Sequence, residues 1–295
     1  MTKEKTKIIS NSDNPRKICV ITGTTNGIGF ETAKLMALDG FSVYTLNRNP
    51  ERAEVATRQL KKQTNREILS IQCDLANLNS IKKATTKILQ STDRVDVLIN
   101  NAGIMTGKHE LSPQGYELTF AVNQIGPFFL TQLLTQSLLK YEGSRIVNIA
   151  SSAHQFGNLN LEELHLYKSM QSTYSRSKLA NVLWTLKLAR EHQNNSLTIN
   201  CMHPGVVATN LLPQSRPLFK ALGKMASSFM MSPQDSAKTV HYVATAKHLK
   251  EVSGKYFNAK GKQISPSNKA RNTKHQDSLW ERSLKIVSRN LEDER

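Results

Sequence analysis

Apolar and polar positions follow two alternating patterns along most of the chain. Short runs of β-branched or apolar residues predict buried strands, and each is followed by a turn and a segment with helical spacing of its apolar residues. This alternation is typical of βαβ units, so we expect an α/β fold: one doubly wound domain with a seven-stranded parallel sheet and helices on both faces. The predicted strands are 18–22, 41–46, 68–73, 95–100, 145–150, 197–202 and 255–259, and the predicted helices are 28–39, 51–62, 78–90, 113–140, 173–192 and 234–247.

The two ends of the chain depart from this repeating pattern. Residues 1–15 are polar and basic and predict a flexible tail, without the apolar core of a signal peptide. The α/β domain extends over 16–260, and the polar, turn-rich start of 261–295 predicts a linker. Trp280, Leu284 and Val287 recur at i, i+4 and i+7, which predicts that the last segment is a helix docked on the domain.

The first predicted strand is followed by a glycine-rich turn, TGTTNGIG (22–29). Glycines at this position let backbone N–H groups approach a pyrophosphate, and the N-terminus of the following helix contributes partial positive charge. Because this is the first βα turn of the series, we interpret it as the dinucleotide site of a Rossmann fold, with a purely structural tight turn as the alternative. The predicted binding residues of the turn are Gly23, Thr25, Asn26, Gly27, Ile28 and Gly29.

The ends of the next two strands bear on which dinucleotide is bound. An acidic residue after the second strand normally binds the adenosine ribose of NAD, but here the residues are Asn47 and Arg48. A guanidinium can pair with a 2′-phosphate, so NADP(H) is the preferred cofactor and NAD(H) the alternative, unless Arg48 is only a solvated turn residue. After the third strand, Asp74 and Leu75 are predicted to contact the adenine, with an N-cap role for Asp74 as the alternative.

A tyrosine and lysine pair provides the candidate acid–base chemistry. Lys178 follows Tyr174 by four residues in a predicted helix, so both lie on one helical face, where an ammonium can lower the pKa of a phenol. Such a pair supplies a proton donor near neutral pH. A second pair with the same spacing, Tyr256 and Lys260, begins in a predicted strand and is interpreted as accidental.

Together the motifs resemble the short-chain dehydrogenase/reductase superfamily. The resemblance implies that Tyr174 exchanges a proton with the substrate oxygen, while Lys178 lowers the pKa of Tyr174 and holds the nicotinamide ribose. It also implies that Ser151, or failing that Ser152, polarises the substrate oxygen. The matching motifs, in the family's order along nearly the whole chain, are TGTTNGIG, CDL (73–75), NNAG (100–103), Asn123, IASSAH (149–154), Tyr174-x-x-x-Lys178 and HPGVVAT (203–209).

The same resemblance implies roles for three further segments. Asn123 is expected to interrupt the long helix and to position a water that relays protons to Lys178, with a helix-kink role as the alternative. The NNAG turn is expected to line the cofactor mainly through backbone atoms, or to clamp the sheet. The residues concerned are Asn100, Asn101, Ala102 and Gly103 in this turn, and Pro204, Gly205, Val207 and Thr209 in a turn that cups the nicotinamide.

The distance between the serine and the tyrosine points to one branch of the superfamily. Ser151 and Tyr174 are 23 residues apart, more than in many members, and the extra segment 155–171 is predicted to loop over the pocket or its rim. This spacing, with the SSAH and SKLAN motifs, is similar to the retinol dehydrogenase-like and WW-domain-containing oxidoreductase-like branch. It implies an NADP(H)-dependent oxidoreductase of apolar aldehydes, ketones and alcohols, such as retinoids, steroids or lipid carbonyls. The alternative is a cofactor-bound regulatory or scaffold protein with little turnover.

Residues 210–232 resemble the substrate lid of this superfamily. Their apolar stripe gives an adaptable wall for a bulky apolar substrate, although core packing explains it equally well. Basic residues beside the stripe would also allow peripheral contact with an anionic membrane surface. His154 and His203 have no acidic or cysteine neighbours in sequence and predict buried or pocket histidines, so no metal site is expected. The stripe consists of Leu218, Leu222, Met225, Phe229 and Met230.

Composition narrows the class of protein and its partners. The 295 residues include 40 Lys and Arg against 23 Asp and Glu, a formal charge of +17. Because the sequence contains no recognised nucleic-acid-binding module, we interpret this charge as a solvated basic surface and do not expect nucleic-acid binding. Three cysteines far apart predict reduced thiols in the cytoplasm, with membrane association as an alternative, and no stretch approaches the ~20 apolar residues of a spanning helix. The expected partners are a small apolar carbonyl or alcohol substrate and, from the resemblance, further copies of the chain in a homo-oligomer.

Overall fold

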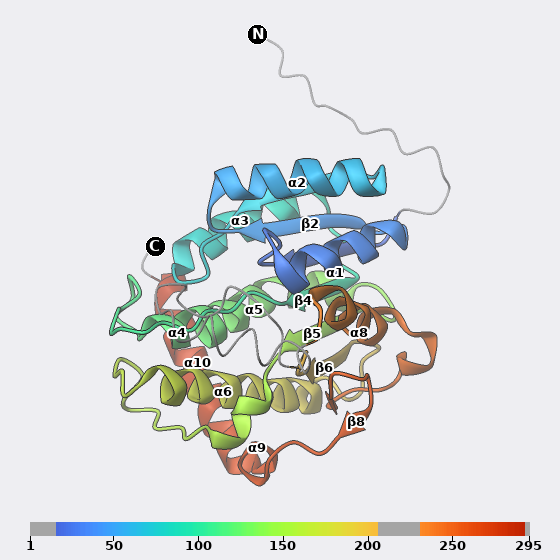
Figure 1. The fold of residues 1–295 in the computed structure, drawn as a ribbon. Helices are drawn as coiled ribbons and strands as arrows, with labels where there is room; N and C mark the ends of the chain where they lie inside the picture. Colours follow the sequence, from blue (N-terminus) through green and yellow to red (C-terminus); the bar gives the residue numbers. More distant parts are fainter. Residues whose placement is uncertain (1–15, 206–230, 293–295) are drawn as a thin grey trace.

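The chain folds around one sheet of eight strands in the order β3-β2-β1-β4-β5-β6-β7-β8. The computed structural model describes residues 16–205 and 231–292 (Figure 1). Neighbouring strands from β3 to β7 are parallel, and β8 is antiparallel to β7. The strands are β1 Ile18–Thr22, β2 Ser42–Asn47, β3 Ile68–Gln72, β4 Val97–Asn100, β5 Arg145–Ile149, β6 Thr198–Met202, β7 Tyr256–Phe257 and β8 Gln263–Ile264.

The seven predicted strands are confirmed, and β8 corrects the prediction that a linker begins at residue 261. The side-chain oxygen of Asn258 accepts hydrogen bonds from the backbone N–H groups of Lys260 and Lys262, both 3.0 Å or shorter. This turn folds the chain back so that β8 pairs with β7. The same turn places Lys260 outside any helix, which agrees with the interpretation of Tyr256 and Lys260 as an accidental pair.

Helices cover both faces of the sheet and enclose two apolar cores. Successive side chains of a strand point to opposite faces, so Cys19 and Ile21 of β1 enter the core beneath α1, α2 and α8. Ile18 and Val20 enter the other core, beneath α3, α5 and α6. The six helices are α1 Gly27–Leu38, α2 Pro50–Thr64, α3 Leu78–Ser91, α5 Gly126–Leu139, α6 Met170–Glu191 and α8 Pro233–Thr245.

The helix predicted over 113–140 is shorter and is interrupted. It begins as α4, Leu118–Phe120, because the carboxylate of Glu117 accepts hydrogen bonds from the N–H groups of Thr119 and Phe120, both at 2.8 Å. A π-helical turn, η1 Ala121–Ile125, follows before α5. Asn123 lies in this turn, so the predicted interruption at Asn123 is found.

The C-terminal segment packs as the helix α10, Thr273–Glu292, beside α6 (Figure 1). Of the predicted stripe, Val287 is buried and Trp280 packs against the core, whereas Leu284 is 38% exposed. Leu279 and Ile286 are buried in addition. Trp280 packs edge-on against Phe128 of α5, with ring centroids 5.1 Å apart. A short helix, α9 Asn268–Arg271, precedes α10. In residues 16–205 and 231–292, the structure contains no helix with the length and apolar character needed to cross a bilayer.

The three cysteines are buried as free thiols, as expected for a chain without disulfides. Burial raises the pKa of Cys73 and of Cys201 to about 12. A thiol must ionise to react, so these side chains behave as small apolar core residues.

Candidate active site

A cleft opens along the carboxyl ends of the central strands and brings together most of the residues predicted from the sequence. Asn100, Asn123 and Ser152 are not among the described residues that line it. Val207, Thr209, residues 1–15 and most of the lid expected at 210–232 lie outside the described residues. The predicted residues that line the cleft are Gly23, Thr25, Asn26, Gly27, Ile28, Gly29, Asn47, Arg48, Asp74, Leu75, Asn101, Ala102, Gly103, Ser151, Tyr174, Lys178, Pro204 and Gly205.

The turn between β1 and α1 forms a cradle of closely packed backbone. Gly23 has φ +72°, which L side chains rarely adopt, and its N–H donates to the carbonyl of Leu46 at 2.9 Å. A Cβ on Gly29 would lie 2.1 Å from the carbonyl oxygen of Gly23 and 2.4 Å from Nδ2 of Asn101. The glycines therefore serve close packing as well as conformation, and they leave the N-terminus of α1 open to the cleft, which fits a bound pyrophosphate.

Replacing Gly29 with alanine is expected to weaken NADPH binding by about 10-fold or more, since relieving the overlap must displace the carbonyl of Gly23 from the cradle. Titration of cofactor fluorescence measures the change. Gly40→Ala is the matched control, because Gly40 also has a positive φ, +89°, but no atom lies within 4 Å of the added Cβ. Equal NADPH affinity in the two variants would contradict the close-packing argument.

At the end of β2, the side chain of Asn47 links the strand to the glycine turn, and Arg52 lines the cleft together with Arg48. The Oδ1 atom of Asn47 accepts from the N–H of Thr24 at 2.8 Å, and its Nδ2 donates to the Thr24 hydroxyl at 2.9 Å. This amide fastens β2 to the glycine turn, at a position where Asn47 also lines the cleft. Arg48 and Arg52 both line the cleft. Arg52 was missed in the sequence, although its position in the first turn of α2, four residues after Arg48, was a usable signal.

Asp74 lies in the cleft wall after β3. One of its oxygens accepts from the N–H of Ala76 at 2.9 Å, and its own N–H donates to the hydroxyl of Ser80. The N-cap of α3 is Asn77, whose side chain accepts from the N–H groups of the helix start. The N-cap alternative for Asp74 is therefore wrong.

The NNAG turn both clamps the sheet and lines the cleft. Asn101 donates through Nδ2 to the carbonyls of Thr22 and Gly23, at 2.9 and 3.0 Å. Asn100 does not line the cleft as expected, because its amide is buried and donates to Thr131 and Asn148. Both predicted roles of this turn are therefore found: the asparagine side chains clamp neighbouring strands, and Asn101, Ala102 and Gly103 border the cleft.

Ser151, Tyr174 and Lys178 meet where β5 ends and α6 passes. The hydroxyls of Ser151 and Tyr174 are hydrogen-bonded to each other. The ammonium of Lys178 donates to the carbonyl of Ile149 at 2.8 Å and lies 5.6 Å from the ring centroid of Tyr174. Ser152 begins the short helix η2, Ser152–Phe156, and is exposed away from the cleft, so Ser151 occupies the serine position of the site.

The pKa values of Tyr174 and Lys178 are both governed by burial. Burial raises the pKa of Tyr174, and the hydrogen bond from Ser151 lowers it only in part. This differs from the expected lowering by Lys178, because that ammonium is directed to the carbonyl of Ile149 instead of the phenol oxygen. Burial also lowers the pKa of Lys178 to about 8, so its charge is poised near neutral pH.

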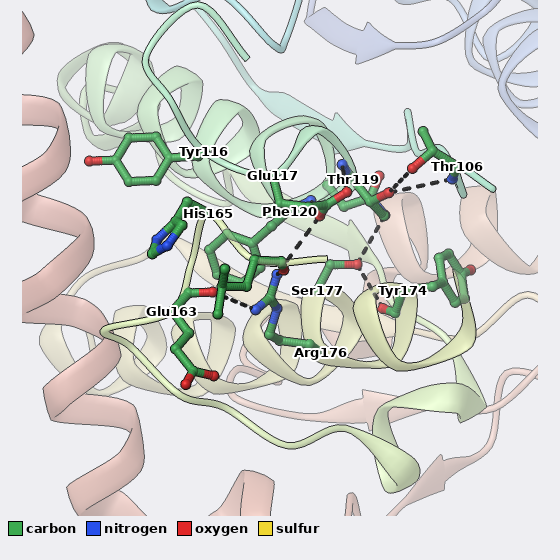
Figure 2. A network of polar contacts seen from close by, with 12 residues as sticks. Thr106, Tyr116, Glu117, Thr119, Phe120, Glu163, His165, Tyr174, Arg176 and Ser177 are labelled. Carbon is green, nitrogen blue, oxygen red and sulfur yellow. Dashed lines mark hydrogen bonds and ion pairs between the residues drawn. The ribbon is translucent and has the colours of Figure 1, made fainter. Parts of the chain in front are cut away.

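Asn123 connects the loop after β4 to the helix that carries Tyr174. Its Oδ1 accepts from the N–H of Ile104 at 2.8 Å, and its Nδ2 donates to the carbonyl of Ile104 and to the hydroxyl of Ser177. Ser177 in turn donates to the carbonyl of Tyr174 at 2.7 Å, a contact visible in Figure 2. A Cβ built on Gly103 would lie 3.4 Å from both Oδ1 of Asn123 and Nζ of Lys178, which places these two side chains at one wall.

The extra segment 155–171 was predicted to loop over the pocket or its rim. In the described part of the chain, no residue of this segment lines the cleft. Leu164 is instead buried against the main core, and the guanidinium of Arg176 holds the carbonyls of Glu163 and Leu166 (Figure 2). The segment therefore packs against α6 through Arg176 and against the core through Leu164.

His154 is buried next to Ser151, and each of its two ring nitrogens has a backbone hydrogen-bond partner. Its Nδ1 lies 2.8 Å from the carbonyl oxygen of Ser151, and its Nε2 accepts from the N–H of Ser267 at 3.1 Å. Burial lowers the pKa of His154, so it is neutral at neutral pH. The rings of His154 and His203 both lie near that of Tyr256, with centroids 4.9 and 5.8 Å away. Within residues 16–205 and 231–292, His, Cys, Asp and Glu side chains form no group of three that could hold a metal ion.

The cleft has two polar regions with different chemistry. Arg48 and Arg52 follow β2, whereas Ser151 follows β5, and β1 and β4 lie between these strands. Three strand spacings amount to roughly 14 Å, so one elongated anionic ligand can contact both regions. The first region suits a phosphate, and the second offers two hydroxyls and an amine for proton transfer. The remaining lining residues that the sequence did not single out are Leu46, Asn49, Cys73, Ile104, Val122, Ile149 and Ala150.

Sequence comparison with known proteins identifies a family and relatives that this chain resembles. A family model described as short chain dehydrogenase matches residues 17–218. Human retinol dehydrogenase 13 is 36% identical over 287 residues, covering 94% of this chain and 86% of that protein. Human retinol dehydrogenase 12 is 36% identical over 282 residues, covering 94% and 88%.

Solved structures agree with these matches. A short chain dehydrogenase from Burkholderia cenocepacia, crystallised in complex with NADP, is 26% identical, with a TM-score of 0.68 over 83% of this chain and 96% of that chain. The order of the elements, the glycine cradle and the Ser151, Tyr174 and Lys178 cluster are in keeping with that assignment. The chain belongs to the short-chain dehydrogenase/reductase superfamily, in its retinol dehydrogenase-like branch, and is an NAD(P)-dependent oxidoreductase.

Proposed function

We propose that this oxidoreductase uses NADP(H) to interconvert an apolar aldehyde or ketone and its alcohol. The observation that carries the proposal is the meeting of Ser151, Tyr174 and Lys178 in the same cleft as the glycine cradle and Arg48. Sequence similarity to two human retinol dehydrogenases supports an apolar substrate, and the NADP complex of a similar enzyme supports the cofactor.

In this proposal Tyr174 is the acid that protonates the carbonyl oxygen during reduction. Its raised pKa keeps the phenol protonated at neutral pH, and the hydroxyl of Ser151 donates a second hydrogen bond to the same oxygen. Lys178, charged below a pKa of about 8, favours the phenolate that remains after proton transfer. When bound, the nicotinamide supplies the hydride in reduction and accepts it in oxidation.

The cofactor would be held by the parts of the cleft already described. The N–H groups at the start of α1 would bind the pyrophosphate, and Arg48 with Arg52 would pair with the 2′-phosphate. Pro204 and Gly205 would border the nicotinamide at the end of β6. Asn123 would act by holding Ile104 and Ser177 in place.

The substrate class is supported by the apolar part of the cleft lining. Ile104, Val122, Ile149 and Ala150 are apolar residues of the same cleft lining and offer little to a polar substrate. Membrane contact by the predicted lid at 210–232 and assembly into a homo-oligomer stay predictions from the sequence.

NADPH oxidation measured over a panel of retinaldehyde, steroid ketones, medium-chain aldehydes and a small polar aldehyde tests this function. We expect turnover of the apolar carbonyls and little of the small polar one. Tight NADPH binding with no turnover of any panel member would favour the regulatory or scaffold alternative. Preferred turnover of the small polar aldehyde would overturn the apolar substrate class.

Replacing Arg48 with alanine is expected to raise the Kd for NADPH by about 10- to 100-fold while leaving the Kd for NADH nearly unchanged. A hydrogen-bonded charge contributes about 1.5–3 kcal/mol, and only NADPH carries the 2′-phosphate. Arg58→Ala is the matched control, since Arg58 lies on α2 with its side chain 70% exposed and pairs only loosely with Glu54 at 3.8 Å. An equal loss of affinity for both cofactors would assign Arg48 a role other than phosphate recognition.

A further inference from the structure

Arg176 is a buried cation on the helix that carries Tyr174 and Lys178. Tyr174 and Lys178, four residues apart, line the cleft, whereas Arg176 between them is not among the described residues that line it. In Figure 2 the side chains of Tyr174 and Arg176 leave the helix in different directions. Its side chain is 6% exposed. Its two terminal nitrogens donate to the carbonyl oxygens of Glu163 and Leu166, each at 2.9 Å. One guanidinium thus fastens the 155–171 segment to the catalytic helix.

Glu117 is the anionic partner of Arg176 and is fully buried. Its carboxylate lies 3.9 Å from the Arg176 guanidinium and accepts from the two N–H groups that start α4. The backbone N–H of Glu117 donates to the carbonyl of Leu164 at 3.0 Å. The Arg176 guanidinium also lies over the ring of Phe120, 5.3 Å from its centroid. Glu117 therefore ties the same 155–171 segment to the start of the helix that leads into Asn123.

This arrangement joins three segments behind the active site. The 155–171 segment, the α4–η1 turn and α6 meet at Glu117 and Arg176, and Ser177 adds a bond from Asn123 to the carbonyl of Tyr174. A buried ion pair contributes little net stability against an apolar pair of equal volume, because desolvation offsets the attraction. Together Arg176 and Glu117 make five hydrogen bonds to backbone groups of the 155–171 segment and of α4, so the pair is better suited to fixing geometry.

We propose that Arg176, paired with Glu117, is a positioning residue for Tyr174 and Lys178. By anchoring α6 to the 155–171 segment and to the turn of Asn123, it fixes the register of the catalytic helix against β5, where Ser151 lies. The proposal rests on Tyr174 acting as the acid. A positioning role predicts a change in kcat and in its pH profile with little change in NADPH affinity, because the glycine cradle lies on other elements.

The test compares Arg176→Met with Arg190→Met, which removes an arginine from the exposed end of the same helix, where it pairs with Asp277. Turnover is expressed per NADPH-binding site, so that unfolded protein does not count, and amide hydrogen exchange follows residues 121–125 and 155–171. We expect Arg176→Met to lower kcat about 10-fold or more, to shift its pH profile and to speed exchange in both segments. The KM for NADPH should stay within about two-fold of the wild type, and Arg190→Met should change none of these quantities.

Two further variants keep the proposal testable if Arg176→Met does not fold. Arg176→Lys keeps the charge but not the two-pronged contact, and should restore folding with an intermediate kcat. Glu117→Gln combined with Arg176→Met removes the lone buried carboxylate, and should regain stability without regaining turnover. Wild-type kcat and pH profile in any folded Arg176 variant would overturn the proposal. If the wild type turns over no carbonyl, the proposed function fails, and unchanged exchange of 155–171 in Arg176→Met would then separately refute the anchoring.

Discussion

Replacing Tyr174 with phenylalanine is expected to lower kcat/KM for carbonyl reduction by about 10²- to 10⁴-fold, the usual contribution of a positioned general acid. The change removes one oxygen, which in the structure is hydrogen-bonded to Ser151, and leaves the ring with its centroid 5.6 Å from the Lys178 ammonium. NADPH affinity should change little, since the cradle is built by β1 and α1. Stopped-flow measurement of NADPH oxidation together with a binding titration separates the two quantities.

Tyr242→Phe is the matched control for Tyr174→Phe. The hydroxyl of Tyr242, a residue of α8, is hydrogen-bonded to His248 in an exposed position just after that helix, so its removal should leave turnover unchanged. Because burial raises the pKa of Tyr174, reduction by the wild type should be flat through neutral pH and fall only in alkaline solution. Alcohol oxidation needs the phenolate and should rise with pH over the same range. Full turnover in Tyr174→Phe would rule out Tyr174 as the acid.

The sequence predicted the sheet and the cleft well because both depend on local patterns. A buried parallel strand needs a continuous apolar run, and a pyrophosphate cradle needs glycines at the turn that follows β1. The same reasoning located Arg48 and Tyr174, which follow a strand end or begin a helix, while the resemblance to the superfamily supplied Ser151. These features depend on residues close together in the chain, so a single sequence contains enough information to find them.

The structure differs from the sequence-based predictions where contacts between segments far apart in the chain determine which side chains are buried or bonded. Leu284 fits the predicted stripe of α10 but is exposed, whereas Leu279 and Ile286 of the same helix are buried. The 155–171 segment packs beside α6 because Arg176 and Glu117 anchor it, and neither residue is marked by any local pattern. Asn47 similarly lies at a ligand-binding strand end while its amide bonds to Thr24, a partner 23 residues away.

Replacing Lys178 with methionine is expected to lower kcat/KM by about 10²-fold or more and, at the same time, to stabilise the folded protein near pH 7. The loss of activity follows from the missing positive charge beside Tyr174 and from the loss of an amine that borders the cleft. The gain in stability follows because Lys178 is buried and within the described structure meets a carbonyl oxygen, that of Ile149, but no carboxylate. Methionine fills similar space without a charge to desolvate.

The pH dependence of stability gives this prediction its sign and size. Burial lowers the pKa of Lys178 from 10.5 to about 8, so between these values the unfolded chain binds more protons and the wild-type free energy of unfolding gains from this group as pH rises. At pH 7 the buried charge costs about 3 kcal/mol at about 1.4 kcal/mol per pKa unit, with the bond to Ile149 included in the shifted pKa. Lys178→Met should therefore exceed the wild type by up to about 3 kcal/mol at pH 7, and the difference should shrink toward zero between pH 8 and 10.5.

Denaturant unfolding of both proteins at pH 7 and pH 10 measures this difference. Lys187→Met on the same helix is the control with the opposite sign, because Lys187 pairs with Glu191 at 2.7 Å and Asp277 at 3.0 Å, and these carboxylates raise its pKa. Its removal should lower the stability or leave it unchanged. A Lys178→Met protein less stable than the wild type at pH 7 would mean that the ammonium is compensated in its site, and that burial does not set its pKa. If Lys178→Met gains stability and loses activity, the charge of Lys178 serves catalysis and lowers the free energy of unfolding of the wild type.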